Sequence, residues 1–120
     1  MPPRTAKQLS GDAGEALAAD YLARHGVRVV ERNFRVKGGE IDLICRDGVM
    51  TVFVEVRYRR GGGGSGFGGA AASITSAKQR RLILAARHWL LQHGEVPCRF
   101  DAVLIDGDRL EWLRAAFTAD

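Results

Sequence analysis

The dipeptide Asp47-Gly48, placed between two apolar runs, is the feature that most constrains how this chain can fold. An Asp-Gly pair in such a position is a strong signal for a β-hairpin with a short loop. It therefore predicts that a strand over residues 40–45 is joined to a strand over residues 50–57. Because the second strand contains the run Val52-Phe53-Val54, we expect it to be central in its sheet and largely buried.

Hydrophobic periodicity and turn residues place the other elements around this hairpin. The first three strands form a meander, since Lys37-Gly38-Gly39 supplies a turn before the hairpin. The order αβββαββ predicts an α/β fold in which a mixed sheet is flanked by helices. The further predicted elements are helices over residues 12–25 and 74–92 and strands over residues 27–35, 99–105 and 109–113.

The length of 120 residues and the 46% hydrophobic content suit one domain with one core. We assign residues 1–10 to a flexible N-terminal segment and residues 11–120 to the domain. Neither an apolar leader in residues 1–10 nor a run long enough to span a membrane is present, so we expect a cytoplasmic protein without a membrane partner. Cys45 and Cys98 lack the spacing of zinc ligands, and the glycine-rich stretch 61–69 lacks the GK[ST] of a phosphate-binding loop.

Basic residues accumulate in the middle of the chain, which carries a formal net charge of +4. No Asp or Glu occurs over residues 57–94. Such a distribution is found both in solvated surfaces and in surfaces that bind polyanions, and charge alone does not separate the two. The basic residues of this stretch are Arg57, Arg59, Arg60, Lys78, Arg80, Arg81 and Arg87.

Strand alternation brings several acidic residues together on one face of the predicted sheet. A two-residue turn at Asp47-Gly48 would place Asp42 opposite Phe53, with Glu55 as the diagonal neighbour of Asp42. Two carboxylates so placed can ligate one metal ion; alternatively they are ordinary strand acids, with Arg57 as the cation paired to Glu55. The predicted faces are Glu40, Asp42, Phe53, Glu55 and Arg57 on one side, and Ile41, Leu43, Val52, Val54 and Val56 on the other.

Two helical residues could join these acids. Glu15 follows Asp12 by three positions, so it is either a catalytic acid or the second member of a capping box at the start of the first helix. Lys78 is in register with the apolar stripe of the second helix, where it either points along the sheet or extends to solvent at the helix start.

The chain resembles the PD-(D/E)xK, restriction-endonuclease-like nucleases, and in particular their archaeal Holliday-junction-resolvase branch. More closely, it resembles the YraN family of bacterial proteins, which are regarded as endonuclease-like. The resemblance covers about residues 11–105. It rests on these segments: 11–15, Tyr21-Leu22, Gly26, Asn33-Phe34-Arg35, 39–44, 53–57, Lys78 and Arg99-Phe100-Asp101.

This resemblance implies a metal site and a reaction. Asp42, Glu55 and the backbone carbonyl of Val56 would be ligands of Mg²⁺ or Mn²⁺, and Glu15 a ligand directly or through water. Arg57 stands where the nuclease motif has lysine, and unlike lysine it cannot give up its proton. Lys78 would then supply the missing ammonium group.

The function expected on this basis is hydrolysis of phosphodiester bonds by a metal-dependent endonuclease. DNA is the expected substrate rather than RNA, with branched intermediates of recombination or repair as one class, and cleavage of both strands would suit a homodimer. The second reading is a nucleic-acid-binding module that keeps the nuclease fold without catalysis. Contacts to the phosphate backbone are expected from Arg59, Arg60, Arg80 and Arg81.

Overall fold

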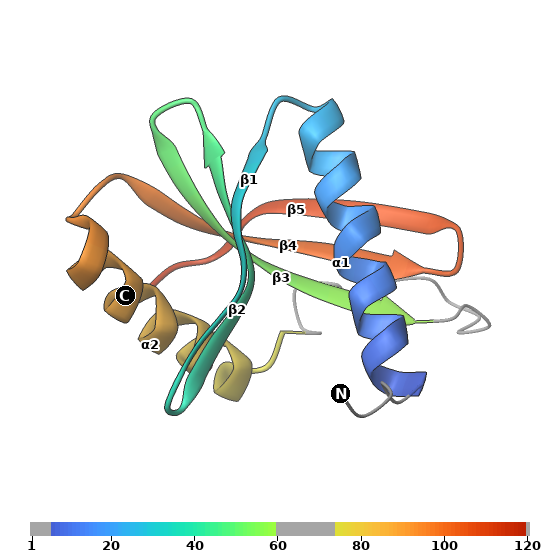
Figure 1. Cartoon of the computed structure of the whole chain (residues 1–120), viewed down its shortest axis with the longest axis horizontal. Helices are drawn as coiled ribbons and strands as arrows, with labels where there is room; N and C mark the ends of the chain where they lie inside the picture. Colours follow the sequence, from blue (N-terminus) through green and yellow to red (C-terminus); the bar gives the residue numbers. More distant parts are fainter. Residues whose placement is uncertain (1–5, 60–73, 120) are drawn as a thin grey trace, which may run out of the picture.

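The computed structural model describes the backbone of residues 6–59 and 74–119 and the side chains of residues 13–58 and 74–119. The predicted order αβββαββ is confirmed (Figure 1). Its elements are α1 (Ala6–Arg24), β1 (Arg28–Val36), β2 (Gly39–Asp47), β3 (Met50–Arg59), α2 (Ser76–His93), β4 (Cys98–Asp106) and β5 (Arg109–Phe117).

The five strands form one mixed sheet in the order β1-β2-β3-β4-β5. All neighbouring pairs are antiparallel except β3 and β4, which run parallel because α2 carries the chain back between them. The strand β3 is therefore central, as the run Val52-Phe53-Val54 predicts, and all three of these side chains are buried.

Each helix covers one face of the sheet. Ala18, Ala19 and Leu22 of α1 pack against Val52, Val54 and Val103. On the opposite face Leu82, Ala85, Ala86 and Trp89 of α2 pack against Phe53 and Phe100. In the described part of the chain, neither helix is long and apolar enough to cross a membrane.

The first helix begins six residues earlier than predicted, at Ala6 instead of residue 12. Asp12 and Glu15 therefore lie inside α1, and the interpretation of these residues as a capping box at the helix start is wrong. The second half of the segment 1–10, predicted to be flexible, belongs to α1, and residues 1–5 lie outside the described residues, as does the glycine-rich stretch 61–69. The second helix begins at Ser76 instead of residue 74, with Thr75 as its N-cap.

The register predicted for the β2–β3 hairpin is wrong by two positions. Asp47 pairs with Met50, so the two turn residues are Gly48 and Val49. Gly48 has a φ of +61° and occupies the first turn position, where type II′ hairpins favour glycine. The ladder runs to the pair Leu43 and Val54, which makes Asp42 and Glu55 the next facing positions.

The prediction that Ile41 shares a face with Leu43 is also wrong. Leu43 packs in the α1 core, whereas Ile41 packs in the α2 core, although alternate residues of a strand normally share a face. The switch occurs opposite Asn33, which lies between the paired positions of β1 and has a φ of +54°. A left-handed residue here reverses the direction of the side chains that follow, so β1 and β2 change faces together.

The second helix rests directly on the turn between β1 and β2. A β-carbon added at Gly39 would lie 2.5 Å from the backbone oxygen of Arg81 and 3.0 Å from the backbone nitrogen of Ala85. Both are helix backbone atoms that cannot move aside without shifting α2. Glycine is therefore required at this position for α2 to approach the hairpin that carries Asp42.

We expect Gly39→Ala to lower the unfolding free energy by about 1–3 kcal/mol, because overpacking forces the backbone to shift. Urea denaturation would measure the difference. Val49→Ala is the control, since it changes an exposed side chain in the turn at the other end of β2. Equal losses in the two variants would contradict a packing effect.

Candidate metal centre

The centre of the site is the point where β2 and β3 part. Beyond the pair Leu43 and Val54 the two backbones no longer pair, and the side chain of Asp42 occupies the opening. The backbone N–H of Val56 donates a hydrogen bond of 2.8 Å to Asp42 Oδ2. A carboxylate thus replaces the backbone carbonyl that would otherwise continue the ladder.

The same hydrogen bond fixes the direction of the Val56 carbonyl. A residue in an extended strand directs its N–H and its C=O toward the same neighbouring strand. Since the N–H of Val56 faces Asp42, its carbonyl oxygen also faces the opening beside β2. Two kinds of oxygen donor, a carboxylate and a backbone carbonyl, therefore meet at one place.

Glu55 adds a second carboxylate at this opening. Burial, followed by the charge of Asp42, raises the pKa of Glu55 from its ordinary value of 4.5 to about 8. Burial likewise raises the pKa of Asp42 to about 6, although the hydrogen bond from Val56 acts in the opposite direction. The physical cause is that two facing carboxylates in a partly buried place cannot both carry charge at low cost.

The first helix brings Glu15 to the same acids. Gly14 is buried against β3, and a β-carbon added there would lie 2.8 Å from Cβ of Tyr58. This close approach places Glu15 near enough to Asp42 for the charge of Asp42, after burial, to raise the pKa of Glu15. A hydrogen bond from the side chain of Asn33 acts in the opposite direction.

Asn33 is a residue of this site to which the sequence analysis assigned no role, although it belongs to a segment that carries the resemblance. It faces Asp42 across the β1–β2 ladder, contacts Glu15 and has a positive φ. Asparagine is the residue that combines a tolerated left-handed backbone with a side-chain donor. An Asn in the middle of a predicted strand was the available signal, because that residue type is depleted in strands.

Three arginines surround the acids without pairing closely with them. The charge of Arg57 lowers the pKa of both Asp42 and Glu55, and Arg35 acts on Asp42 while pairing with Glu40 at 3.5 Å. Arg32 acts on Glu15. Within the described residues neither Asp42 nor Glu55 forms an ion pair, so the alternative in which Arg57 simply pairs with Glu55 is not what the structure contains.

The other basic residues named in the sequence analysis lie on α2 or outside the residues whose side chains are described. Lys78 is half-buried in the first turn of α2, four positions before the buried Leu82, in register with the apolar stripe. Arg80 and Arg81 are exposed on α2. The side chain of Arg59 and the whole of Arg60 are not described.

A divalent cation fits the chemistry of this donor set. Among the described residues no three Asp, Glu, His or Cys side chains are gathered closely enough to form a complete set of ligands. Mg²⁺ does not require such a set, because it commonly keeps several waters and takes one or two carboxylates from the protein. Burial and neighbouring carboxylates raise the pKa values of Asp42 and Glu55 despite the charge of Arg57, and a bound cation would act against both causes.

Comparison with known proteins places the chain in a family. Residues 14–105 match the model of the uncharacterised protein family UPF0102, a range that begins one residue before Glu15 and ends within β4. The chain belongs to the UPF0102 family. Among its relatives is a UPF0102 protein of Dechloromonas aromatica, 61% identical over 110 residues that cover 92% of this chain and 89% of the relative.

Two further UPF0102 proteins match nearly the whole chain. The protein of Janthinobacterium sp. (strain Marseille) is 53% identical over 120 residues, covering 99% of this chain and 95% of its own length. That of Ralstonia pickettii is 54% identical over 121 residues, covering 98% and 97%. The similarity thus extends over nearly the whole length of all three chains.

A second polar cluster of the UPF0102 chain is structural. The fully buried Asp101 accepts hydrogen bonds from Arg99, from Trp112 Nε1 at 2.9 Å and from the Ala115 N–H at 2.9 Å. Arg99 also pairs with Asp47 at 3.0 Å. Both carboxylate oxygens of Asp101 accept hydrogen bonds, as a buried carboxylate requires. The contacts of this cluster link β5 and the β2–β3 turn to β4.

We expect Glu55→Gln to stabilise the metal-free protein at pH 8 by on the order of 1–3 kcal/mol, with the difference shrinking toward pH 4.5. The folded chain holds the proton of Glu55 up to about pH 8, whereas the unfolded chain releases it near 4.5. The contribution of Glu55 to stability is therefore greatest below pH 4.5 and falls as the pH rises through this window. Glutamine mimics the protonated acid and avoids that loss.

Urea unfolding in EDTA at pH 5, 6.5 and 8 would measure this dependence for the native protein and the variant. A variant less stable than the native protein at pH 8 would show that the Glu55 carboxylate is favourably paired, contrary to the geometry.

We expect Asn33→Ala to lower the unfolding free energy by roughly 1–2 kcal/mol, because alanine lacks the short polar side chain that lets asparagine tolerate a left-handed backbone. Asn33→Gly keeps the backbone favourable and removes only the hydrogen bond to Glu15, so it should raise the pKa of Glu15. Carboxyl NMR titration and urea unfolding would measure the two effects. An equal stability loss in both variants would argue against the backbone role.

Proposed function

We propose that this protein is a metal-dependent nuclease of the PD-(D/E)xK class that hydrolyses phosphodiester bonds in DNA. The observation that carries the proposal is the pair Asp42 and Glu55, held together at the opening between β2 and β3 without an ion-pair partner in the described residues. Keeping two facing acids partly buried is costly, and a cation that both can ligate offsets the cost. The placement of the UPF0102 chain among YraN-type endonuclease-like proteins is part of the same proposal.

The ligands of Mg²⁺ or Mn²⁺ would be the carboxylates of Asp42 and Glu55 and the carbonyl oxygen of Val56, with Glu15 acting directly or through water. Such an ion lowers the pKa of a bound water and offsets negative charge on the phosphate oxygens. Asp42 is held for this role by the Val56 N–H, and Glu15 by the side chain of Asn33.

Basic residues of the chain would bind the negatively charged phosphates of the substrate. Arg57 stays protonated, so it orients the phosphate and stabilises charge without taking a proton from water. Lys78, half-buried at the start of α2, is the proposed source of an ammonium group. Arg59, Arg60, Arg80 and Arg81 are proposed to contact the phosphate backbone outside the reacting centre.

A second candidate function is a nucleic-acid-binding module that retains the fold and the metal without hydrolysing its ligand. The observation that favours it is Arg57, because a guanidinium group cannot replace lysine in any step that requires loss of a proton. Both candidates predict nucleic-acid binding, and only cleavage separates them.

We expect the native protein to cleave labelled duplex, single-stranded or four-way-junction DNA when Mg²⁺ or Mn²⁺ is present. Asp42→Asn and Glu55→Gln should each lower the cleavage rate by at least about a hundredfold, corresponding to the several kcal/mol that a metal contributes to such a reaction. The same two variants should lose the rise in Tm that Mn²⁺ gives the native protein.

Asp108→Asn is the matched control, because it removes an exposed carboxylate from the turn between β4 and β5. Binding of DNA without cleavage, together with a Tm that still rises with Mn²⁺, would favour the binding module. Absence of both metal binding and nucleic-acid binding would contradict both candidates.

A further inference from the structure

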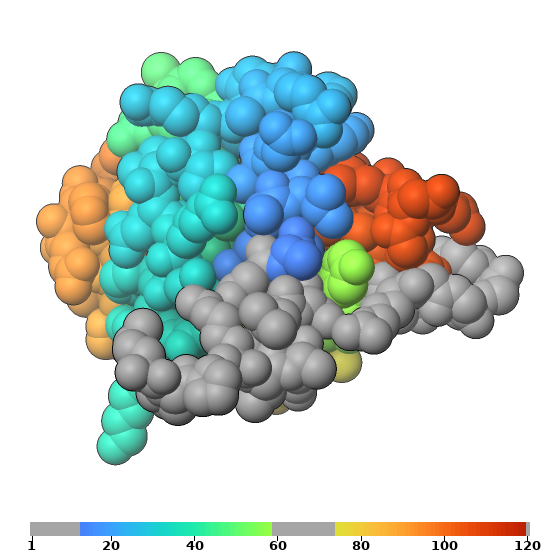
Figure 2. Space-filling view, turned by 45° about the vertical axis from the view of Figure 1, so that its right-hand side comes forward, coloured from blue at the N-terminus to red at the C-terminus, as the bar shows by residue number. Residues whose placement is uncertain are grey.

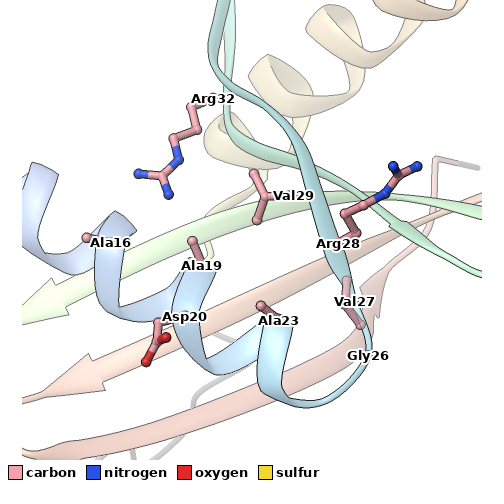
Figure 3. Close-up of a pocket in the computed structure, with 9 residues that line it drawn as sticks. All are labelled: Ala16, Ala19, Asp20, Ala23, Gly26, Val27, Arg28, Val29 and Arg32. Atoms are coloured by element: carbon pink, nitrogen blue, oxygen red, sulfur yellow. The ribbon is translucent and has the colours of Figure 1, made fainter.

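A groove of about 560 Å³ runs between α1 and β1, on the face of the sheet that α1 covers (Figure 3). Figure 2 shows the two walls side by side, with α1 in blue and the β1–β2 hairpin in cyan. The lining residues come from α1, from the turn that follows it and from β1. They are Ala16, Ala19, Asp20, Ala23, Gly26, Val27, Arg28, Val29 and Arg32.

The groove exists because the side chains of α1 that face it are small. Ala16, Ala19 and Ala23 follow one another at helical spacing along the wall. The helix ends at Arg24, Gly26 turns the chain with a φ of +85°, and the buried Val27 leads into β1. Alanine at these positions leaves room for an extended chain to lie against the helix.

The charge on the walls is positive. Asp20, the acidic lining residue, is paired with Arg24 at 2.7 Å. Figure 3 shows the guanidinium group of Arg32 reaching toward α1 near Ala16. Within the described part of the chain neither Arg28 nor Arg32 is in an ion pair, so both are available to an anion.

One end of the groove meets the candidate metal centre. Ala16 directly follows Glu15, and Arg32 directly precedes Asn33, the residue that donates to Glu15. The charge of Arg32 acts on Glu15, which confirms that the arginine and the acids share one neighbourhood. A polyanion that reaches the carboxylates can therefore continue into the groove.

We propose that this groove binds one sugar–phosphate strand of a nucleic acid, with Arg32 contacting a phosphate beside the carboxylates and Arg28 a phosphate farther along. The inference rests on the proposed function, and it differs from the phosphate contacts assigned to Arg80 and Arg81. Those arginines belong to α2, which covers the opposite face of the sheet. Of the two arginines in the described groove wall, Arg32 is the one whose charge also acts on Glu15.

The test is binding of a fluorescently labelled oligothymidylate, measured by anisotropy in EDTA at several salt concentrations so that cleavage plays no part. We expect Arg32→Ala to weaken binding several-fold and to lower the slope of log Kd against log salt by about 0.7, the value for one phosphate contact with a single strand. Arg32→Lys keeps the charge and should retain most of the binding. Ala23→Glu, which places an acid in the groove, should also weaken it.

Two control variants make the same charge changes on α2. Arg87→Ala and Leu91→Glu alter exposed positions and should leave the affinity within about twofold, since a surface charge away from the contact is screened by salt. Circular dichroism and Tm would establish that each variant folds.

The outcomes separate the two proposals. If the native protein binds and cleaves nucleic acid but Arg32→Ala and Ala23→Glu bind as well as native, the groove is not the binding site while the nuclease proposal stands. Equal weakening by Arg87→Ala would likewise overturn the groove, because the effect would then follow net charge. A native protein that binds no oligothymidylate would overturn the groove proposal, whereas the nuclease proposal falls only if none of the three forms of DNA is cleaved.

Discussion

The hydrogen bond from the Val56 N–H to the Asp42 carboxylate closes the place where the two central strands stop pairing. Without this bond the opening would leave a partly buried backbone donor without a partner, at a cost of about 1–3 kcal/mol. The bond also orients the Val56 carbonyl and holds Asp42 against Glu55. Stability of the sheet and assembly of the candidate site thus depend on one carboxylate.

Other parts of the fold hold the strands and helices around this opening. On one face α1 approaches β3 closely because position 14 is glycine, which brings Glu15 to the acids. On the other face α2 rests on Gly39, at the start of the strand that carries Asp42. The Asp101 cluster links β5 and the β2–β3 turn to the first half of β4. Each contact is a close approach or a satisfied buried polar group, so few substitutions are compatible with it.

The acids themselves are unfavourable for the fold. Burial and mutual repulsion raise the pKa values of Glu15, Asp42 and Glu55, so their charged forms destabilise the metal-free protein. Acids with perturbed pKa values are common at functional sites, where the charge that destabilises the free protein binds a ligand. The groove beside α1 begins next to these acids, and its arginines supply positive charge there. In the proposed site the acids bind the metal and the arginines bind the phosphates.

The sequence by itself determined the order of the elements, the central position of β3 and the meeting of Asp42 with Glu55. These follow from local periodicity, turn residues and strand alternation, and the meeting of Asp42 with Glu55 survived the register error because a shift of two positions turns diagonal neighbours into facing ones. Only the tertiary structure decided that the hairpin turns at Gly48 and Val49, that Asn33 reverses the faces of β1 and β2, and that α1 begins at Ala6. The reason is that turn type, backbone reversal and helix packing depend on contacts between residues distant in the chain, such as Gly14 with Tyr58, which no local pattern encodes.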